Sequence, residues 1–282
     1  MPLVPTASLV GPAHAAGRAV AAFNVITLEH AEAVAAGAER AGAAVAMQVS
    51  ENCVRFHGGW LRPIANAAAA VARSSTVDIG LHLDHVRHDE LLYQAADCGF
   101  SSVMYDASPL SYVDNVRATA AAATWAQARG LWVEAELGEV GGKDGPHAPW
   151  VRTDPAQAAA YVAATGVDAL AVAVGSSHAM TSRTAAIDHE LVTRLRDAVP
   201  VPLVLHGSSG VPDAELRRAV RSGLVKINIG TALNIAFTGA VRRHLPDDAA
   251  VVDPRPYLGA ARDAMADVVE HLVGVVSHPR AE

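Results

Sequence analysis

The chain has little cysteine and no excess of positive charge, and each shortage excludes a class of protein. Its only cysteines are Cys53 and Cys98, too few for a disulfide framework and not in a C-x-x-C spacing, so both are expected to be reduced, packed thiols. The net charge of -7 gives no basic surface for nucleic acid or an acidic membrane. We therefore expect neither nucleic acid nor a membrane among the partners.

Targeting and membrane signals are also missing. The segment MPLVPTASLV has neither the basic start nor the apolar core of a signal peptide. No apolar run approaches the roughly 18 residues that a membrane-spanning helix needs. The expected location is the cytoplasm.

What the chain does contain is a repeated alternation of short apolar runs with longer alanine-rich segments. With 51% hydrophobic and 18% charged residues, its 282 residues can bury a large core. The apolar runs have the length and composition of strands. There are eight of them, at residues 19–25, 44–50, 77–85, 101–107, 131–140, 169–175, 202–207 and 225–230.

The segments between these runs have helical period, and several open on Asp and close on Gly, as helices do. Eight strand-helix units whose strands are apolar throughout favour a closed parallel barrel. An open doubly wound sheet usually has a Gly-rich turn after its first strand, and FNVITLEH has none. We predict an α/β fold, a (β/α)8 TIM barrel in one domain over residues 1–282, with an N-terminal cap helix and an extra C-terminal helix.

Polar residues gather where the predicted strands end, which is where barrels of this class carry their active sites. Three of the 13 histidines, His85, His178 and His206, lie at or just beyond strand ends. Three imidazoles with an open fourth position suit catalytic zinc, although their spacing is no signature and position alone leaves a metal site undecided. Asp84 and His85 are adjacent, so both reach the site only if the regular strand ends there.

A second group has the form of a phosphate site. HGSSG (206–210) follows the seventh strand, and NIGT (228–231) leads from the eighth strand into a helix. Barrels that bind phosphorylated substrates place the phosphate at these two loops, on backbone N–H groups and a helix N-terminus. Ordinary turn glycines would give the same pattern without a phosphate. The loop 136–155 is long and Gly-rich, with Gly141 and Gly142 as candidate hinges, and is either a lid or a surface excursion.

Seven motifs in order resemble the class II, zinc-dependent ketose-bisphosphate aldolases, the fructose- and tagatose-bisphosphate aldolase family. They are AFNV, LHLDH, SVMYDAS, VEAELGEVGG, DALAVAVGSSHAM, LVLHGSSG and KINIGTAL. The resemblance implies reversible cleavage of a ketose 1,6-bisphosphate to dihydroxyacetone phosphate and glyceraldehyde 3-phosphate. It also implies Zn²⁺, with Na⁺ or K⁺ as a further cation, and a homodimer or homotetramer.

The resemblance also implies roles for individual residues. His85, His178 and His206 correspond to zinc ligands, and Asp106 and Glu134 to acids around the metal. Asp84 corresponds to the acid/base for the C4 hydroxyl, Asn228 lies near the reacting carbons, and Asp144 is a candidate for proton exchange. The substrate is expected on the following residues: Gly207, Ser208, Ser209, Gly230, Thr231, Asn24 and Ser50.

Two departures from the family pattern leave the sugar undecided, and rival hypotheses remain. Family members usually have acids where this chain has Lys143, and many have Asp at the position of Gly230. A Schiff-base aldolase would need a lysine, and the chain offers Lys143 and Lys226 alone. The remaining hypotheses are a class II-type aldolase for a different phosphorylated ketose, a metal-free sugar-phosphate isomerase, and a barrel that binds sugar phosphates without turnover.

Overall fold

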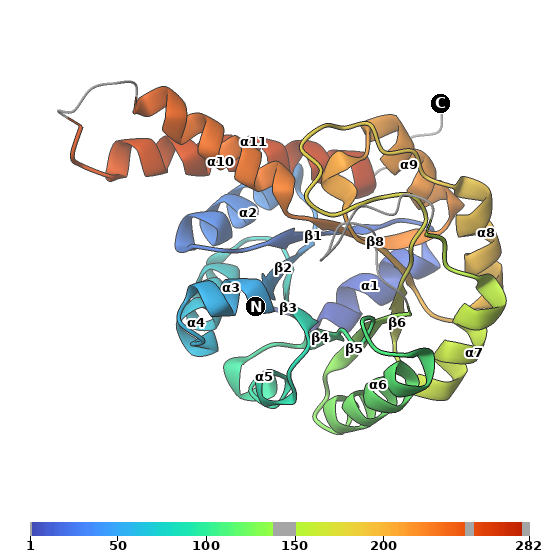
Figure 1. Ribbon diagram of the computed structural model, residues 1–282. Coiled ribbons are helices and arrows are strands. Elements are labelled where there is room, and N and C mark those ends of the chain that lie inside the picture. Colours follow the sequence, from blue (N-terminus) through green and yellow to red (C-terminus); the bar gives the residue numbers. More distant parts are fainter. Residues whose placement is uncertain (1, 138–150, 246–250, 278–282) are drawn as a thin grey trace.

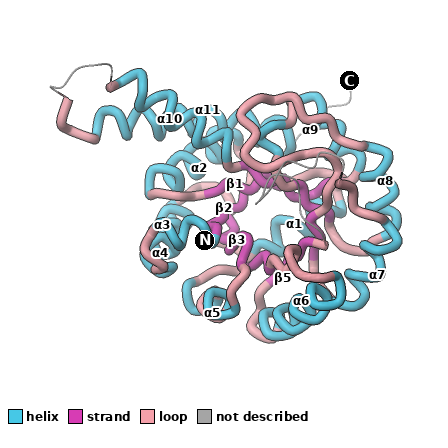
Figure 2. The backbone as a smooth tube through the Cα atoms, viewed as in Figure 1, coloured by secondary structure: helices cyan, strands magenta, loops and turns pink. Residues whose placement is uncertain are grey.

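Eight parallel strands close into a barrel in the order of the chain (Figures 1 and 2). The structure is a computed structural model and describes residues 2–137, 151–245 and 251–277. Every strand predicted from the sequence is present, and the first pairs with the eighth to complete the ring. The strands are β1 (Val20–Asn24), β2 (Val45–Ser50), β3 (Ile79–Val86), β4 (Ser102–Tyr105), β5 (Trp132–Glu136), β6 (Ala169–Ala171), β7 (Leu203–Leu205) and β8 (Leu224–Ile229).

Helices surround the strands, and several begin and end as their sequences predict. Asp154 caps α7 (Pro155–Thr165) by accepting a hydrogen bond from Gln157 N at 2.8 Å, and Asp188 caps α8 (His189–Ala198) by accepting one from Leu191 N at 2.9 Å. Gly42 follows the last residue of α2 (Leu28–Ala41), and its φ of 63° suits glycine. The helices along the barrel are α2 (Leu28–Ala41), α3 (Glu51–Phe56), α4 (Leu61–Ser74), α5 (Asp89–Leu92), α6 (Tyr112–Gln127), α7 (Pro155–Thr165), α8 (His189–Ala198), α9 (Asp213–Ser222) and α10 (Thr231–His244).

The predicted cap helix is α1 (Thr6–Ala15), which lies across the N-terminal opening of the ring (Figure 2). Leu9 and Val10 pack there with Val20 and Val225 from β1 and β8. The Thr6 side chain fits because β3 has Gly80 at the contact, where an added Cβ would lie 2.9 Å from Thr6 Oγ1. The opening opposite α1 is the one left for a site.

The predicted extra C-terminal helix is α11 (Arg255–Ser277), which pairs with α10 and packs along α2 (Figure 1). Arg40 on α2 forms ion pairs with Asp267 and Glu270, both at 2.9 Å. The far ends of α10 and α11 extend beyond the ring of helices (Figure 1). Among the described residues, no helix has the length and apolarity needed to cross a membrane.

The barrel interior holds polar side chains as well as the expected apolar ones. Gln48, His82, Glu134 and Lys226 are each 0% exposed, on strands whose other residues are almost all buried too. Charged groups at such depth are stable only when paired and hydrogen-bonded. Glu134 and Lys226 meet this condition, because they form an ion pair with each other at 2.8 Å. Cys53 and Cys98 are buried and unpaired, as predicted.

Candidate active site

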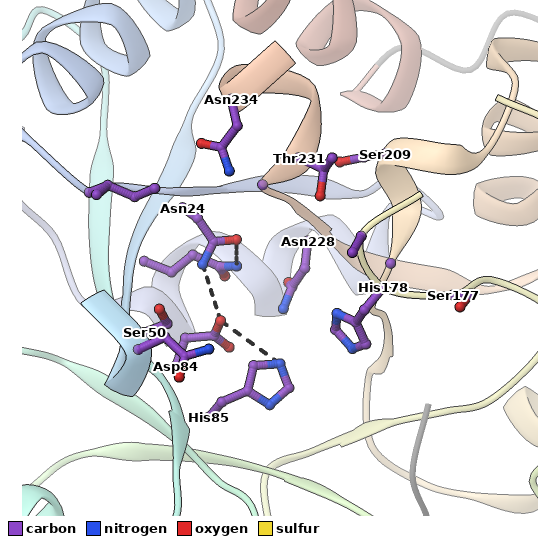
Figure 3. Close-up of a pocket in the computed structure, with 16 residues that line it drawn as sticks. Asn24, Ser50, Asp84, His85, Ser177, His178, Ser209, Asn228, Thr231 and Asn234 are labelled. Carbon is purple, nitrogen blue, oxygen red and sulfur yellow. Dashed lines mark hydrogen bonds and ion pairs between the residues drawn. The ribbon is translucent and has the colours of Figure 1, made fainter. Parts of the chain in front are cut away.

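A cavity of about 220 Å³ opens at the C-terminal ends of the strands (Figure 3). Its walls come from β1, β2, β3 and β8 and from the loops after β6 and β7. The structure therefore brings together most of the residues singled out in the sequence. Those that line the cavity are Asn24, Ser50, Asp84, His85, His178, Gly207, Ser209, Asn228, Gly230 and Thr231.

His85, His178 and His206 converge as the barrel fold predicts. One ring nitrogen from each can be chosen so that the three lie within 4.8 Å of one another. The ring centroids of His85 and His206 are 4.7 Å apart, and those of His85 and His178 are 5.4 Å apart. Three imidazoles at this separation have the donor set and spacing of a zinc site with an open position.

The neighbours of these histidines fix which nitrogens face the centre. His206 Nε2 lies 2.8 Å from Glu134 Oε1, and His85 Nδ1 lies 3.2 Å from Asp106 Oδ2. A carboxylate that accepts one ring N–H leaves the other nitrogen with its lone pair, as metal-ligating histidines require. His206 Nδ1 is buried and has no hydrogen-bond partner among the described residues. The residues present therefore fit a zinc ion.

The conflict between Asp84 and His85 is resolved by an irregularity in β3. The strand does not end at His85 but continues to Val86 with a register shift against β4 between Leu83 and Val86. His85 has a φ of 52°, in the left-handed region that residues other than glycine seldom occupy. This local bulge turns the backbone so that two neighbouring side chains reach the same cavity.

Asp84 lies beside the histidines and is only 2% exposed. Its Oδ2 accepts a hydrogen bond from Asn24 Nδ2 at 3.2 Å and lies 4.0 Å from His85 Nε2. Burial by itself would raise the pKa of Asp84, but positive charge on His85, His206, His82 and Lys226 outweighs it and lowers the pKa to about 2. The carboxylate is therefore ionised at neutral pH and able to accept a proton.

The loops after β7 and β8 meet at the other side of the cavity. Ser209 Oγ accepts a hydrogen bond from Ala232 N at 3.1 Å, which ties the β7 loop to the first turn of α10. Thr231 begins α10, so the positive end of that helix points at the cavity. Ser208 differs from its neighbours because its hydroxyl donates to the Asn228 carbonyl at 2.5 Å. Ser208 therefore supports the loop from behind.

Position 207 has room only for glycine, and any other residue there would rearrange this loop. Its φ is 67°, and an added Cβ would lie 2.5 Å from both Ser177 C and Ser177 O. Both neighbours are backbone atoms, which cannot move aside cheaply. We expect Gly207→Ala to lower the thermal midpoint and to raise the KM for a phosphorylated substrate. A calorimetric scan with unchanged midpoint together with an unchanged KM would contradict this placement. Gly259→Ala in α11, where a Cβ meets nothing within 4 Å, is the control.

Amide side chains line the remaining wall of the cavity. Gln48 Nε2 donates to Asn24 Oδ1 at 3.1 Å, and Asn24 in turn donates to Asp84. Gly230 fits close to this chain, since its Cβ would lie 2.8 Å from Asn24 Oδ1. Ser50 caps α3 by accepting from Cys53 N at 3.2 Å. Sequence reasoning missed the remaining residues of this wall, because strand and helix positions gave them no distinctive spacing: Ile26, Gln48, Asn52 and Asn234.

Comparison with known proteins agrees with this geometry. The family model described as fructose-bisphosphate aldolase class-II matches residues 4–278. The chain belongs to the class II fructose-bisphosphate aldolase family. The fructose-bisphosphate aldolase of Geobacillus stearothermophilus is 38% identical over 273 residues, covering 95% of each chain, and that of Staphylococcus epidermidis is 34% identical, covering 96% of each.

Solved structures of aldolases show the same architecture. The YdjI aldolase from Escherichia coli K12 superposes with a TM-score of 0.84 at 33% identity, with 97% of each chain covered. A putative fructose-1,6-biphosphate aldolase from Coccidioides immitis gives a TM-score of 0.84 at 28% identity, covering 95% of this chain and 94% of its own. The predicted (β/α)8 barrel is confirmed.

Asp106 and Glu134, the predicted acids around the metal, are not among the residues that line the cavity. Asp106 lies with His85 and Glu136 in a second set of donor atoms within 4.8 Å of one another, whereas Glu134 contacts His206 and Lys226. Glu136 is thus the acid of β5 that joins Asp106. The candidate hinges Gly141 and Gly142, together with Lys143 and Asp144, lie outside the described residues. The roles of all these residues stay predictions.

The surroundings of Lys226 argue against the Schiff-base hypothesis. Its Nζ is 2.8 Å from both Glu134 Oε2 and Asn228 Oδ1, and the residue is 0% exposed. This amine is already hydrogen-bonded to two side chains of the barrel interior and does not line the cavity, whereas attack on a ketone needs an amine that reaches the substrate. We expect borohydride treatment with substrate to leave the mass of the Lys226 peptide unchanged. A reduced substrate adduct on that peptide in mass spectrometry would contradict this assignment.

Proposed function

We propose that the protein is a zinc-dependent aldolase that reversibly cleaves a ketose 1,6-bisphosphate, fructose or tagatose bisphosphate, to dihydroxyacetone phosphate and glyceraldehyde 3-phosphate. One observation carries the proposal. Three imidazoles converge beside an ionised, buried carboxylate, opposite a loop pair suited to phosphate. Membership of the class II aldolase family supports it.

The cavity suggests how a substrate would lie. The phosphate of the dihydroxyacetone half would meet the backbone of Gly207, the Ser209 hydroxyl and the N-terminus of α10 at Thr231. The ketone end would then point toward the histidines, and the remaining carbons toward Asn24 and Ser50. This orientation places the C4 hydroxyl on the Asp84 side of the cavity.

Each residue then has one task in cleavage. Asp84 Oδ1 is buried and has no hydrogen-bond partner among the described residues, so it is available to take the C4 hydroxyl proton as the C3–C4 bond breaks. His85, His178 and His206 would hold zinc, which when bound supplies Lewis-acid stabilisation of negative charge on oxygen. Asn228 would donate a hydrogen bond to the oxyanion of the enediolate. The bond electrons remain on the dihydroxyacetone half until it is reprotonated.

The direct test is an assay with both sugars. Purified enzyme is incubated with fructose 1,6-bisphosphate or tagatose 1,6-bisphosphate, and dihydroxyacetone phosphate is measured by its enzymatic reduction. We expect cleavage of at least one sugar, and the ratio of the two kcat/KM values identifies the preferred one. A protein that binds zinc but cleaves neither would require a different phosphorylated ketose as substrate. Interconversion of an aldose and a ketose phosphate without cleavage would favour the isomerase hypothesis.

Several expectations from the sequence accompany this proposal and stay predictions. They are a cytoplasmic location, a homodimer or homotetramer, one domain over residues 1–282, and a monovalent cation besides zinc. The roles given to individual site residues are proposals of the same kind. The finer identity of the sugar depends on a few hydrogen-bonding contacts at the amide-lined wall, where a misplaced hydroxyl would leave a polar group unpaired and lower the rate.

A further inference from the structure

Lys226 is a buried charged group to which the proposed cleavage reaction gives no task. It lies inside the barrel on β8, 0% exposed, and it is not among the residues that line the cavity. Its ammonium donates to Glu134 Oε2 and to Asn228 Oδ1, each at 2.8 Å. Burial of a charge without function costs stability even when the charge is paired. The contact with Asn228 shows what this charge does.

We propose that Lys226 is a positioning residue that fixes the orientation of the Asn228 amide. An ammonium group has three donors and no acceptor, so Asn228 must turn its oxygen toward Lys226. The NH₂ group is then directed away from Lys226. Figure 3 shows the Asn228 side chain reaching from β8 toward the space between His178 and Asp84. Lys226 thus decides whether Asn228 presents its NH₂ donor or its oxygen acceptor to the cavity.

The surroundings of Asn228 support this orientation. Asn228 Nδ2 is buried and has no hydrogen-bond partner among the described residues. A buried donor without an acceptor lowers the stability of the free protein. The unpaired Asn228 Nδ2 therefore points to an acceptor that arrives with the substrate. An NH₂ group suits the enediolate oxygen, whereas a flipped amide would present its own oxygen and repel it.

The same ammonium group is also linked to one of the histidines, His206, through Glu134. Glu134 Oε2 faces Lys226, and Glu134 Oε1 accepts from His206 Nε2 at 2.8 Å. Lys226 and His206 thus bind the two carboxylate oxygens of Glu134, so a shift of Glu134 would disturb the ring of His206. Removal of Lys226 changes two contacts, and the experiment has to separate the effect through Asn228 from the effect through Glu134.

A double-mutant cycle makes that separation, and it rests on the proposed aldolase function. kcat, KM and zinc content are measured for wild type, Lys226→Met, Asn228→Ala and the double variant, each loaded with zinc. We expect Asn228→Ala to lower kcat by about 10²–10³-fold, the usual loss for one oxyanion donor. Lys226→Met should lower kcat by about 10–100-fold, as losses of supporting partners do, with little change in KM.

The decisive comparison is the effect of Lys226→Met in the Asn228→Ala background. If Lys226 acts through the amide, that effect shrinks to within about twofold, because no amide is left to orient. Multiplicative losses would overturn the proposal and leave Lys226 a structural residue. Lys226→Gln, which keeps a side-chain NH₂ donor, should recover part of the lost kcat. A kcat for Lys226→Gln that is no higher than the kcat of Lys226→Met would also contradict the proposal.

Stability controls keep the result interpretable. Tyr161→Phe removes buried hydrogen bonds to Asn115 and Thr119 on α6, and none of the three residues lines the cavity. The variant should lower the thermal midpoint while leaving kcat within about twofold. If Lys226→Met fails to fold because Glu134 keeps an unpaired charge, the cycle is repeated with Glu134→Gln present. There the loss caused by Lys226→Met should likewise shrink to within about twofold once Asn228→Ala is also present.

A readout without turnover separates failure of this proposal from failure of the aldolase assignment. Phosphoglycolohydroxamate has the phosphate and the planar, charged oxygens of the enediolate, and its Kd is measured by calorimetry across the same four proteins. Tight binding without cleavage would overturn the substrate assignment, while coupling between Lys226 and Asn228 in Kd would still support the positioning role. Wild-type protein that neither cleaves nor binds would overturn both.

Discussion

Asp84→Asn is expected to lower kcat for bisphosphate cleavage by about 10²–10⁴-fold, the range for loss of a positioned general base. Asparagine has nearly the same shape and still meets Asn24, but its amide takes no proton from the C4 hydroxyl. Since the pKa of Asp84 is lowered to about 2, the wild-type base is ionised throughout the neutral range and the loss should not be recovered by raising the pH.

The matched control for this variant is Asp114→Asn on α6, whose side chain is 47% exposed. It removes a carboxylate from the same protein without touching the cavity, and kcat should stay within about twofold, since exposed ion pairs contribute little. Zinc content is measured for both variants. A normal kcat for Asp84→Asn with zinc bound would show that another group takes the proton.

His206→Ala is expected to lose both zinc and activity. Loss of an outer partner of a ligand already costs about 10–100-fold in metal affinity, so loss of a ligand should cost more than about 100-fold. The deleted imidazole also removes a hydrogen bond from Glu134, whose Oε1 accepts from His206 Nε2 at 2.8 Å. Metal analysis after dialysis against a weak chelator measures the affinity, and the coupled cleavage assay measures the rate.

His244→Ala is the control for this histidine, since His244 lies exposed in the last turn of α10 and outside the cavity. It should keep its zinc and its kcat. If His206→Ala kept stoichiometric zinc, or if His244→Ala lost it to the same degree, the three-histidine site would be wrong.

The strands were predictable from sequence because each is an apolar run between turn residues, and the barrel follows from repetition of the unit. The lengths were less predictable. β6 and β7 are three residues each, although the apolar runs extend over 169–175 and 202–207. The residues that follow β6 and β7 are largely buried but are not part of a strand, because the loops that carry His178 and Gly207 begin there.

The convergence of the histidines was predictable from strand ends, but the backbone at His85 was not. A φ of 52° arises from the register shift between β3 and β4, which depends on pairing between residues far apart in sequence. Strand alternation places Lys226 and Asn228 on the same side of β8, so their proximity was predictable. The choice of Glu134 as the partner of Lys226 was not, because it depends on how β5 and β8 face each other across the barrel.

The measurement that tests the central claim most directly is cleavage of fructose and tagatose 1,6-bisphosphates before chelation, after chelation and after zinc is restored. The account predicts that removal of the metal abolishes cleavage and that stoichiometric zinc recovers it. The recovered rate should follow zinc occupancy at His85, His178 and His206. Cleavage that persists at full rate after complete removal of metal would contradict the account.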